Sequence, residues 1–587
     1  MITIIKRNKN IDNDKIVELA KKHKTTTKII ELLLNRGYEE QDLYKYIQHQ
    51  DFFIDSYDSI VNSKEAATKI IEYLNDDKAS IYVYGDYDCD GVMSMSIMQG
   101  VLVAIKDSLG SKVELNFKTP NRIDGYGLSM AWCKKTFPKK QRKKTLIVTV
   151  DNGITKKAEV EYLKSKNVEV VITDHHAPKN GYVPDCIVVD PWLNDTESEN
   201  ALGLCGAFVA FKVCGEILNL YEDDSNYILN YVPNVAMATI TDMMPATQEN
   251  IGIVGYGLWL IKSGYATEAI NYYKRYVNKD ITVKDIAFEI GPQVNACGRM
   301  GKIEVATNFM NSTDEKDLEE FYHTMLTLND ERKELEKQIL EEIIQYDYSN
   351  DLIIIAHVPN LGGLGGTVAS KVVEAYGKPA IILSGVGDIL HGSARSYGNI
   401  DLHALFSNEV AIGNMIDFGG HHGAAGVTVA KNKIDDLRQS INLVLASLLL
   451  ESELNDEEIE EQNINIEVDD IIKLNDIKRT TVSPYSELLC FGNLKEPVFA
   501  IKDLNVIEAR SSSNNPNHLC LNLEDETCTV KKNRYGKLVG KEIWIWNKMN
   551  EYKNLGEPKK VHLIGSLVPD FRNPKYYTFD VQSIIPA

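Results

Sequence analysis

The sequence predicts an α/β protein in which two α/β domains are joined by a long helix and followed by a C-terminal β-barrel. Three observations support this prediction. Short apolar strands alternate with helical segments between residues 64 and 195, which is typical of a parallel, doubly wound sheet. A second alternation of strand and helix runs from about 351 to 450, after apolar positions at helical spacing over 318–343. The remaining residues, from about 471 on, contain several short strands of a small barrel.

The first α/β region consists of helices and strands that follow one another in regular order. The sequence predicts helices over 65–74, 92–105 and 157–165, and strands over 81–84, 146–150 and 168–172. Ligands of such folds bind at the edge of the sheet where the carboxyl ends of the strands lie. The side chains that follow these strands are therefore the candidates for a functional site.

Three carboxylates stand at alternate positions directly after the first strand: Asp86, Asp88 and Asp90. Side chains alternate along an extended chain, so this spacing can aim several of them in the same direction. Crowded carboxylates repel one another unless a cation lies between them, and a hard divalent cation with oxygen ligands is the natural candidate. A solvated Asp-rich turn is the alternative interpretation.

Three further polar clusters follow apolar segments. Asp151 follows the strand ending at residue 150, Asp174-His175-His176 follows the segment 171–173, and Asp242 follows the segment 235–240. Each cluster alone has a structural explanation, as a turn residue, a hydrogen-bonded histidine or a helix cap. The four clusters together predict a metal site, because mixed carboxylate and imidazole ligands suit Mn²⁺, or Mg²⁺ with fewer imidazoles.

Length and composition exclude several classes of protein. The 587 residues predict three to four domains, and the nine scattered cysteines form no CxxC pair, which favours a reducing cytoplasm. We expect no membrane span and no signal peptide, because no apolar stretch is long enough and the N-terminus lacks a cleavage site. The net charge of −20 confines any nucleic-acid binding to a local groove.

The four clusters resemble, in order and spacing, the four successive motifs of the DHH phosphoesterase superfamily. Within it, the sequence most resembles the RecJ family of single-strand-specific exonucleases. Segments 121–127 and 291–301 are similar to RecJ segments, with Gln293 where a basic residue is usual. Residues 392–396 and 419–426, which we predict to be glycine-bearing turns, resemble the DHH-associated domain that holds the terminal phosphate of the strand. Residues 491–499 resemble the start of the RecJ OB-fold, and the resemblance covers about 50–587.

The resemblance implies hydrolysis of a phosphodiester by two divalent cations, Mn²⁺ or Mg²⁺. The implied metal ligands are Asp86 and Asp88 for one ion, Asp90 and His175 for the other, and Asp151 and Asp242 close to both. The implied catalytic residues are Asp174, His175 and His176. The implied substrate-binding residues are Arg122, Tyr126, Asn295, Arg299, Ser393, Arg395, Gly420 and His421, with Arg395 and Ser393 at the 5′-phosphate.

The residue patterns and the resemblance together predict a division of the chain into domains. These are an N-terminal helical cap on the following domain over 1–50, a DHH domain over 51–305, a connecting helix over 306–346, a DHH-associated domain over 347–450, an acidic linker over 451–475 and an OB-fold-like domain over 476–587. In the barrel, Trp544, Trp546, Tyr576 and Tyr577 are either base-stacking residues or core.

The implied function is a 5′→3′ exonuclease that degrades single-stranded DNA to mononucleotides in recombination and repair. The resemblance allows a helicase or a single-strand-binding protein as a partner, and the absence of a heptad repeat favours a monomer. Two alternatives stay open: a phosphodiesterase for small substrates such as nanoRNA or cyclic dinucleotides, and a non-catalytic replication scaffold on the same fold.

Overall fold

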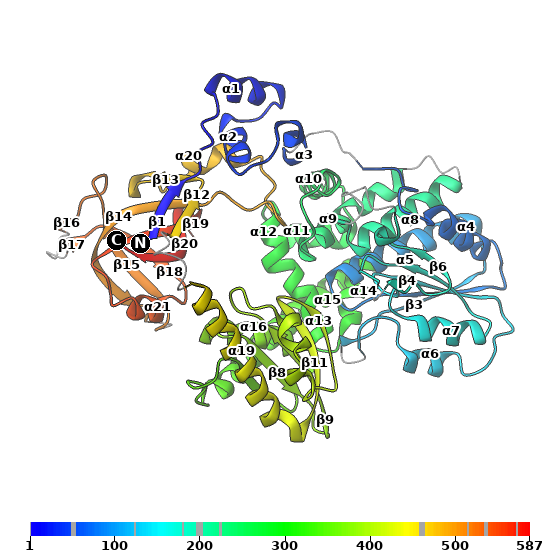
Figure 1. The fold of residues 1–587 in the computed structure, drawn as a ribbon. Helices are drawn as coiled ribbons and strands as arrows, with labels where there is room; N and C mark the ends of the chain where they lie inside the picture. The colour runs from blue at the N-terminus through cyan, green and yellow to red at the C-terminus, as the bar shows by residue number, and fades with distance from the viewer. Residues whose placement is uncertain are drawn as a thin grey trace. The chain divides into compact units, whose positions relative to one another are not determined.

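The structure is a computed structural model that describes residues 2–47, 54–122, 125–178, 181–194, 203–221, 226–456, 464–513, 516–532, 538–570 and 573–587 (Figure 1). The chain forms two compact units. One unit contains Phe52–Met244 and Gly252–Glu460, and the other contains Met1–Asp51, Pro245–Ile251 and Glu461–Ala587. The candidate site lies in the first of these units.

A five-stranded parallel sheet forms the first α/β domain. Its strands are β2 (Ser80–Tyr84), β3 (Glu114–Lys118), β4 (Thr145–Val150), β5 (Glu169–Thr173) and β6 (Ile187–Val189), in the order β3-β2-β4-β5-β6. All neighbouring strands are parallel, so their carboxyl ends share one edge. The three predicted strands are confirmed, whereas the two outer strands, β3 and β6, were not predicted.

Helices cover both faces of this sheet (Figure 1). On one face, α6 (Met130–Thr136) and α7 (Lys157–Ser165) pack against alternate strand residues such as Ile147 and Ile172. On the other face, the helices that contact β2, β4 and β5 are α4 (Ser63–Leu74), α5 (Cys89–Leu109) and α8 (Gly206–Leu220), and α9 (Val232–Thr241) packs on α5 and α8. Burial on both faces explains why these strands are continuous apolar runs.

Helix α5 has the length and apolar composition of a membrane span, which the sequence analysis did not anticipate. It is the only such helix among the residues that the structure describes. Most of its side chains are buried, because α8, α9 and α14 (Ile303–Asn311) pack around it. These contacts identify α5 as the central helix of the domain core.

A helical region follows the first domain. Its members are α10 (Gln248–Ser263), α11 (Glu268–Val277), α12 (Val283–Asp285), the π-helix η7 (Ile286–Ile290), α13 (Gly291–Arg299), α14 (Ile303–Asn311) and α15 (Glu315–Ile344). Helix α15 is the long helix that the sequence predicts. It packs on α13 and α14 at one end and on α16 (Gly365–Tyr376) of the second domain at the other.

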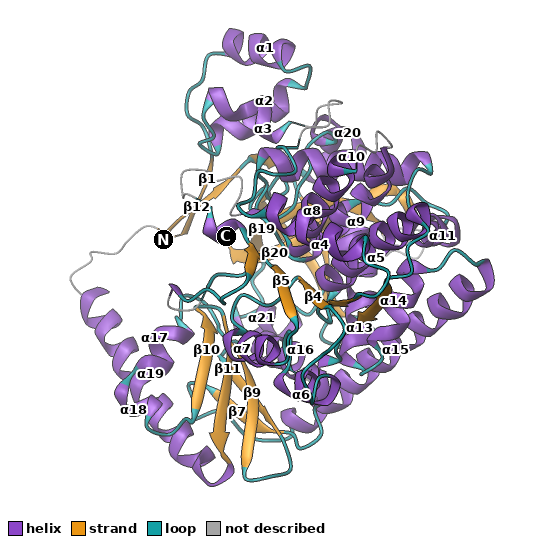
Figure 2. Cartoon of the chain, turned by 90° about the vertical axis from the view of Figure 1, so that its right-hand side faces the viewer, coloured by secondary structure: helices purple, strands orange, loops and turns teal. Residues whose placement is uncertain are grey.

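The second α/β domain contains a five-stranded mixed sheet (Figure 2). In spatial order, its strands are β10 (Asp417–His421), β11 (Ala424–Ala430), β9 (Ile389–Arg395), β8 (Ala380–Ser384) and β7 (Ile354–His357), and only β7 and β8 are parallel. Alternate residues of β7 pack against α17 (Leu402–Ser407) and α19 (Ile434–Asp456) on one face, and against α15 and α16 (Gly365–Tyr376) on the other. Helix α18 (Glu409–Ile412) lies beside α19.

Two segments of this domain differ from the prediction. Residues 389–395 form strand β9, so the predicted turn over 392–396 is wrong. Residues 417–430 form a hairpin of β10 and β11, in which only residues 422–423 are the turn. Gly392 occupies a strand position because a Cβ atom there would lie 2.7 Å from the Leu383 side chain. Gly392 and Gly420, which the sequence analysis assigned to turns, instead lie in strands where a neighbouring strand leaves no room for a side chain.

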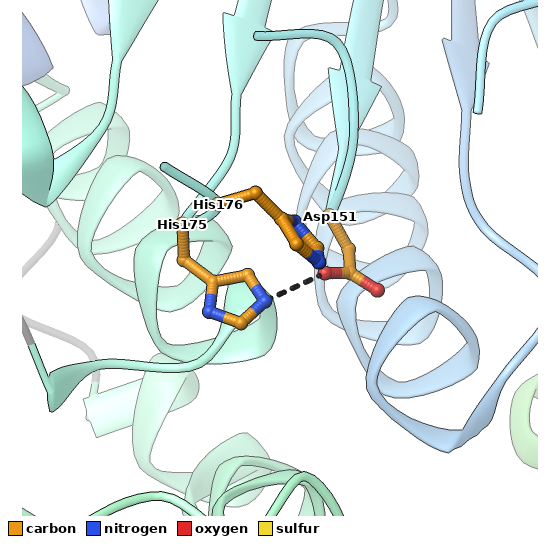
Figure 3. Close-up of side chains that lie close together, drawn as sticks. All are labelled: Asp151, His175 and His176. Atoms are coloured by element: carbon orange, nitrogen blue, oxygen red, sulfur yellow. Dashed lines mark ion pairs between the residues drawn. The ribbon is translucent and has the colours of Figure 1, made fainter. Parts of the chain in front are cut away.

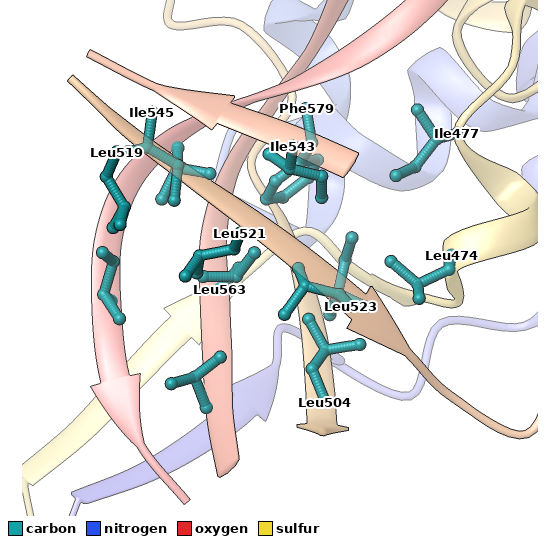
Figure 4. Close-up of a cluster of buried hydrophobic side chains, with 14 of the residues drawn as sticks. Leu474, Ile477, Leu504, Leu519, Leu521, Leu523, Ile543, Ile545, Leu563 and Phe579 are labelled. Atoms are coloured by element: carbon teal, nitrogen blue, oxygen red, sulfur yellow. The ribbon is translucent and has the colours of Figure 1, made fainter. Parts of the chain in front are cut away.

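The C-terminal sheet curls into an OB-like half-barrel around the core shown in Figure 4. Its strands are β14 (Phe499–Ser511), β15 (Leu519–Glu524), β18 (Lys541–Ile545), β19 (Lys560–Asp570) and β20 (Asn573–Pro586), in the order β18-β15-β14-β19-β20, with β13 (Asp470–Ile472) beside β14. The short elements are α20 (Arg479–Val482), α21 (Met549–Asn554) and the pair β16 (Lys531–Lys532) and β17 (Leu538–Val539). Trp546 and Tyr576 are exposed, so they are not barrel core.

The N-terminal residues belong to the barrel unit, which corrects the prediction of a cap on the first α/β domain. Strand β1 (Ile2–Lys6) pairs in parallel with β12 (Ile464–Val468), and Ile4 packs in a core cluster with barrel residues. The helices α1 (Asn13–Lys22), α2 (Thr27–Asn35) and α3 (Leu43–Tyr46) follow. The predicted acidic linker is therefore also wrong over 464–472, which is strand, while 457–463 lie outside the described residues.

Candidate metal centre and phosphate site

The first acidic cluster lies where β2 turns into α5. Asp88 caps the first turn of α5, because its side chain accepts a hydrogen bond from the Gly91 amide at 3.1 Å. Gly91 lies against the backbone of Asp86, where a Cβ atom would come within 2.6 Å of the Asp86 carbonyl. A glycine at this position allows the turn to close, and the closed turn gathers Asp86, Asp88 and Asp90.

Asp90 lies inside the first turn of α5 and is held by the start of α8. Its carboxylate oxygens accept hydrogen bonds from the amides of Gly206 and Ala207, both at 2.7 Å. These amides are free N–H groups of a helix N-terminus, which stabilise a negative charge. The sequence analysis missed this contact, because no polar side chain caps the start of α8.

Asp151 follows β4 directly and has a left-handed backbone conformation, with φ of 62°. This conformation costs a non-glycine residue about 1–2 kcal/mol, so the surrounding structure must hold it. The Asp151 amide donates to the Thr173 carbonyl at 3.0 Å. Gly206 packs so closely that a Cβ atom there would lie 2.5 Å from the Asp151 Oδ1 atom. The strained residue thus brings its carboxylate beside the start of α8.

The His175 imidazole reaches three carboxylates from the end of β5. Its Nε2 atom lies 3.3 Å from Oδ1 of Asp151, as Figure 3 shows. The same atom lies 3.6 Å from Oδ2 of Asp90 and 3.7 Å from Oδ2 of Asp242. Asp242 follows the C-terminus of helix α9, so one member of the cluster comes from a helix rather than a strand.

Asp174 holds the two histidines in place. Its Oδ1 atom accepts hydrogen bonds from the His175 amide and from the His176 Nδ1 atom, both at 2.8 Å. Its Oδ2 atom accepts from the Ile154 amide at 2.9 Å. The Tyr126 hydroxyl lies 2.9 Å from His176 Nδ1 and donates to the backbone carbonyl that follows β4. The His176 ring is therefore fixed by a buried carboxylate and a tyrosine.

Seven side chains offer metal ligands in three overlapping groups, and in each group the ligand atoms lie within 4.8 Å of one another. The groups are Asp86, Asp88 and Asp151; Asp90, His175 and Asp242; and Asp151, His175 and His176. This grouping pairs Asp86 with Asp88 and Asp90 with His175, as the resemblance implies. Asp151 and His175 each belong to two groups, so they lie at the middle of the cluster.

Among the described residues, no lysine or arginine pairs with the carboxylates of this cluster, and His176 is the one cationic side chain grouped with them. Within that part of the chain, Oδ2 of Asp86 and Oδ1 of Asp151 are buried and accept no hydrogen bond. Burial, together with neighbouring aspartates, raises the pKa of Asp86 and Asp151 well above the usual range and that of Asp242 to about 8. A divalent cation with oxygen and imidazole ligands would supply the missing charge, so these residues fit a metal centre.

The two histidines of the cluster have opposite pKa shifts. Burial lowers the pKa of His175, which favours the neutral imidazole that ligates metals. Burial also acts to lower the pKa of His176, but the hydrogen bond and charge of Asp174 raise it to about 9. His176 is therefore positively charged at neutral pH, and 44% of its side chain is exposed.

Three arginines gather between the two α/β domains of this unit. They are Arg122 after β3, Arg299 at the end of α13 and Arg395 at the end of β9. Burial and the nearby Arg122 lower the pKa of Arg299 to about 10, and the same two causes lower the pKa of Arg395. Arg299 also donates to the Gly363 carbonyl at 3.1 Å. Guanidinium groups held this close together suit a bound phosphate.

Ser393 and Arg395 face the start of helix α16. A Cβ atom on Gly365 would lie 2.9 Å from Ser393 Oγ, and one on Gly366 would lie 2.7 Å from an Arg395 guanidinium nitrogen. The two glycines let these side chains approach the amides at the helix start. Amides of a helix N-terminus bind phosphate, so Ser393, Arg395 and α16 form one candidate anion site.

Gly420 and His421 lie in the neighbouring hairpin. Arg395 pairs with Ala424 of β11, which pairs with His421 of β10, so His421 lies two strands from Arg395. Standard strand spacing makes this about 10 Å. Gly420 packs on the backbone of Ala424 with no room for a side chain. His421 is exposed on the same edge of the sheet as the anion site.

Three other residues have a place that the sequence analysis did not foresee. The Asn295 side chain accepts a hydrogen bond from the Cys89 amide at 2.8 Å, so it braces the first acidic turn. Gln293 is buried, so it does not replace the missing basic residue at the phosphate site. Tyr84, the last residue of β2, packs on Trp132 with ring centroids 4.7 Å apart and belongs to the core between the sheet and helices α6 and α7.

Tyr87 separates the acidic cluster from the arginines, and the sequence analysis missed it. The Arg122 guanidinium lies over its ring, 4.9 Å from the centroid. Burial, followed by the Asp86 charge, raises the pKa of Tyr87 to about 12. The backbone of Tyr87 also packs on Gly298 of α13. In the sequence, Tyr87 stands between Asp86 and Asp88, and this position could have indicated that it belongs to the site.

Comparisons with known proteins agree with this geometry. The profile described as "DHH family, N-terminal domain" matches residues 80–240, and the profile described as "DHHA1 domain" matches residues 362–447. The "Single-stranded-DNA-specific exonuclease RecJ" of Bacillus subtilis is 27% identical over 572 residues, which cover 93% of this chain and 69% of the relative. The RecJ of Thermus thermophilus is 31% identical over 372 residues, covering 62% of this chain and 51% of the relative.

The chain is RecJ-like: it matches the DHH and DHHA1 family models in order and resembles RecJ proteins over most of its length. The RecJ-like fold extends over the whole chain, because the crystal structure of RecJ from Thermus thermophilus in complex with Mn²⁺ matches it with a TM-score of 0.74. That match has 21% identity and covers 100% of this chain and 79% of the other. An exonuclease RecJ bound to manganese matches with a TM-score of 0.56 and 28% identity, covering 67% and 96%.

Proposed function

We propose that this RecJ-like chain is a metal-dependent exonuclease that hydrolyses the phosphodiester bonds of single-stranded DNA. The observation that carries the proposal is the position of a cluster of candidate metal ligands beside a cluster of arginines. In this arrangement the metal ligands would act on the phosphate that is cleaved, and the arginines would bind a second phosphate of the same strand. The names of the relatives, which are single-stranded-DNA-specific exonucleases, support the substrate.

Two groups of ligands would hold the metals, which we propose to be Mn²⁺ or Mg²⁺. Asp86, Asp88 and Asp151 form one group, and Asp90, His175 and Asp242 form the other. Solved structures of RecJ contain these same two ions. Two bound cations would lower the pKa of a bound water and stabilise the leaving oxygen. Asp151 is the candidate for the shared ligand, because its carboxylate also groups with the two histidines.

His176 is proposed to stabilise the reacting phosphate. It is positively charged at neutral pH, it is partly exposed, and Asp174 holds its ring beside the ligand cluster. A charge held in a fixed place favours the negative charge that develops in the transition state. Asp174 acts as a positioning residue, because its acceptor atoms are already used by His175, His176 and Ile154.

The arginine cluster is proposed to bind the 5′-phosphate of the strand. Arg395 and Ser393 lie at the start of α16. Arg122 is close enough to lower the pKa of Arg395, and Arg395 is close enough to lower that of Arg299. A terminal phosphate bound there would place the next phosphodiester at the metal ligands. This arrangement would give mononucleotides in the 5′→3′ direction. We also propose a monomer, from the lack of a heptad repeat in the sequence, and a cytoplasmic location, from the scattered cysteines. A helicase or single-strand-binding partner is a proposal that rests on the resemblance alone.

The test is release of mononucleotides from a labelled, 5′-phosphorylated single strand, with Mn²⁺ or Mg²⁺ and with EDTA. We expect the wild type to be active only with metal and Asp151→Asn to be inactive. The matched control is Asp185→Asn, which removes an exposed carboxylate of the same domain. A series of strand lengths decides between this function and a small-substrate phosphodiesterase. Full activity in Asp151→Asn would refute the metal site.

A further inference from the structure

The carboxyl end of β6 carries an exposed tryptophan that the proposed mechanism does not use. Strand β6 lies at the edge of the parallel sheet, beside β5, so the residues after it share the edge of His175. Trp192 follows in the short helix Pro191–Leu193, and 44% of its surface is exposed. A half-exposed indole beside a catalytic cluster has an apolar face available to a ligand.

Trp192 is anchored at both its backbone and its ring. Its amide donates to the buried carboxylate of Asp190 at 2.9 Å. Its indole Nε1–H donates to the backbone carbonyl of His175 at 3.1 Å. The indole is therefore held at a fixed position relative to a proposed metal ligand, while one part of its surface remains accessible.

The strand order places Trp192 on the opposite side of the metal cluster from the arginines. Arg122 follows β3, the proposed metal ligands other than Asp242 follow β2, β4 and β5, and Trp192 follows β6. Strands lie about 4.8 Å apart, so β6 is about 10 Å from β4, which carries Asp151. From β3 to β6, the edge of the sheet therefore carries the proposed phosphate site, then the proposed metal site, and then the exposed face of Trp192.

We propose that Trp192 stacks on the nucleobase at the 3′ side of the scissile phosphodiester. The inference rests on the proposed function and assigns a role to a residue outside the family motifs. A strand with its 5′-phosphate at the arginines and its first phosphodiester at the metals continues towards β6. Stacking on an aromatic ring accepts any base, as an exonuclease requires. The bond from the indole to His175 fixes the distance between the stacked base and the metal site.

The test compares two 5′-phosphorylated single strands that differ only in the second nucleotide, which is either normal or abasic. The enzymes are the wild type, Trp192→Leu and Trp192→Phe. The control is Trp259→Leu, which removes a tryptophan of similar exposure on α10. Loss of one base–aromatic stack corresponds to about a 5- to 100-fold effect. We expect the kcat/KM of the wild type to be lower by this factor on the abasic strand than on the normal strand, mainly because its KM is higher.

The variants separate stacking from a structural role. Trp192→Leu should cleave both strands equally slowly, Trp192→Phe should retain most of the discrimination, and Trp259→Leu should behave as the wild type. A wild type that cleaves both strands equally well would overturn the inference and leave the proposed function intact. Equal slowing by Trp192→Leu and Trp192→Phe would overturn it as well, since both remove the indole hydrogen bond.

A binding measurement tests the inference without catalysis. A strand with 2-aminopurine at the second position is added to the protein in EDTA, and its fluorescence is followed. We expect quenching by the wild type and by Trp192→Phe, and loss of quenching in Trp192→Leu. If the wild type released no nucleotides but quenched the probe, the proposed function would fail while the stacking site stood. Absence of quenching in the wild type would refute the stacking site.

Discussion

Two buried aspartates, one in each unit of the chain, have opposite electrostatic surroundings. Asp469 of the barrel unit accepts hydrogen bonds from Arg36 at 2.6 and 3.0 Å, from Arg7 at 2.9 Å and from the Val498 amide at 2.8 Å. Burial alone would raise its pKa, but these partners bring it below the usual value. Asp151 has no cationic arginine or lysine partner in the described contacts, and burial with its acidic neighbours raises its pKa.

The difference separates a structural carboxylate from a functional one. The charge of Asp469 is balanced within the protein and holds the N-terminal helices to the strands that follow residue 464. Asp151 has no such arginine or lysine partner among the described residues, which is what the proposed metal site requires of it. Burial alone therefore does not reveal the role of an aspartate, whereas the identity of its partners does.

The largest expected effect is on catalysis. Asp151→Asn keeps the shape of the side chain and removes the charge, so we expect the rate of nucleotide release to fall by about 10³-fold or more. Asp469→Asn should leave the rate per folded molecule unchanged. Nuclease assays normalised by circular dichroism measure both. A rate within tenfold of the wild type in Asp151→Asn would contradict the comparison.

The second effect is on stability. Asp469→Asn leaves Arg36, whose side chain is 9% exposed, buried without its charged partner. We expect the free energy of unfolding of the barrel unit to fall by about 3–5 kcal/mol. The control is Glu467→Gln, because Glu467 is an exposed partner of Arg7 and its pair should contribute less than about 1 kcal/mol. Urea unfolding followed by fluorescence distinguishes the two variants.

Metal binding should stabilise only the unit that contains the acidic cluster. At a Mn²⁺ concentration about 100 times the Kd, one bound ion adds about 2.7 kcal/mol to the free energy of unfolding. Differential scanning calorimetry should show one melting transition rising with Mn²⁺ and the other unchanged. The shift should disappear in Asp151→Asn and persist in Asp469→Asn, and a shift of both transitions would contradict a local site.

The last effect concerns the dependence of stability on pH in the absence of metal. The pKa of Asp242 is about 8 in the folded protein and near 3.8 when unfolded, so the folded state binds more protons between these values. Stability of this unit in EDTA should therefore fall as the pH rises from about 4 to 8, and Asp242→Asn should flatten this dependence. Asp469, with a lowered pKa, should show the opposite sign, since its contribution is lost as the pH falls below 3.8. Thermal melts from below pH 3.8 up to about pH 8 measure both slopes.

The sequence predicts the acidic cluster well because its signal is local. Asp86, Asp88 and Asp90 directly follow an apolar strand, and parallel strands must bring their carboxyl ends to one edge. The same rule brought Asp151 and His175 to that edge without any knowledge of contacts. Trp192 was missed because β6 has only three residues, which is too short for a periodic signal.

The remaining errors concern contacts between distant segments. Strand β1 pairs with β12, and no local pattern in residues 2–6 indicates a partner so far along the chain. The glycines at 392 and 420 resembled turn residues, since a sequence shows the absence of a side chain but not the neighbour that requires it. Asn295 supports Cys89 from 206 positions away, which only the fold reveals.

The parallel pairing of β1 with β12 also determines the order in which the chain can mature on the ribosome. Arg7 and its partner Asp469 lie 462 positions apart. At a synthesis rate of about 5–20 residues per second, the N-terminal segment waits about 20–90 seconds for its partner strand. The metal-binding unit is synthesised within that interval, so the first residues of the chain are among the last to reach their final place.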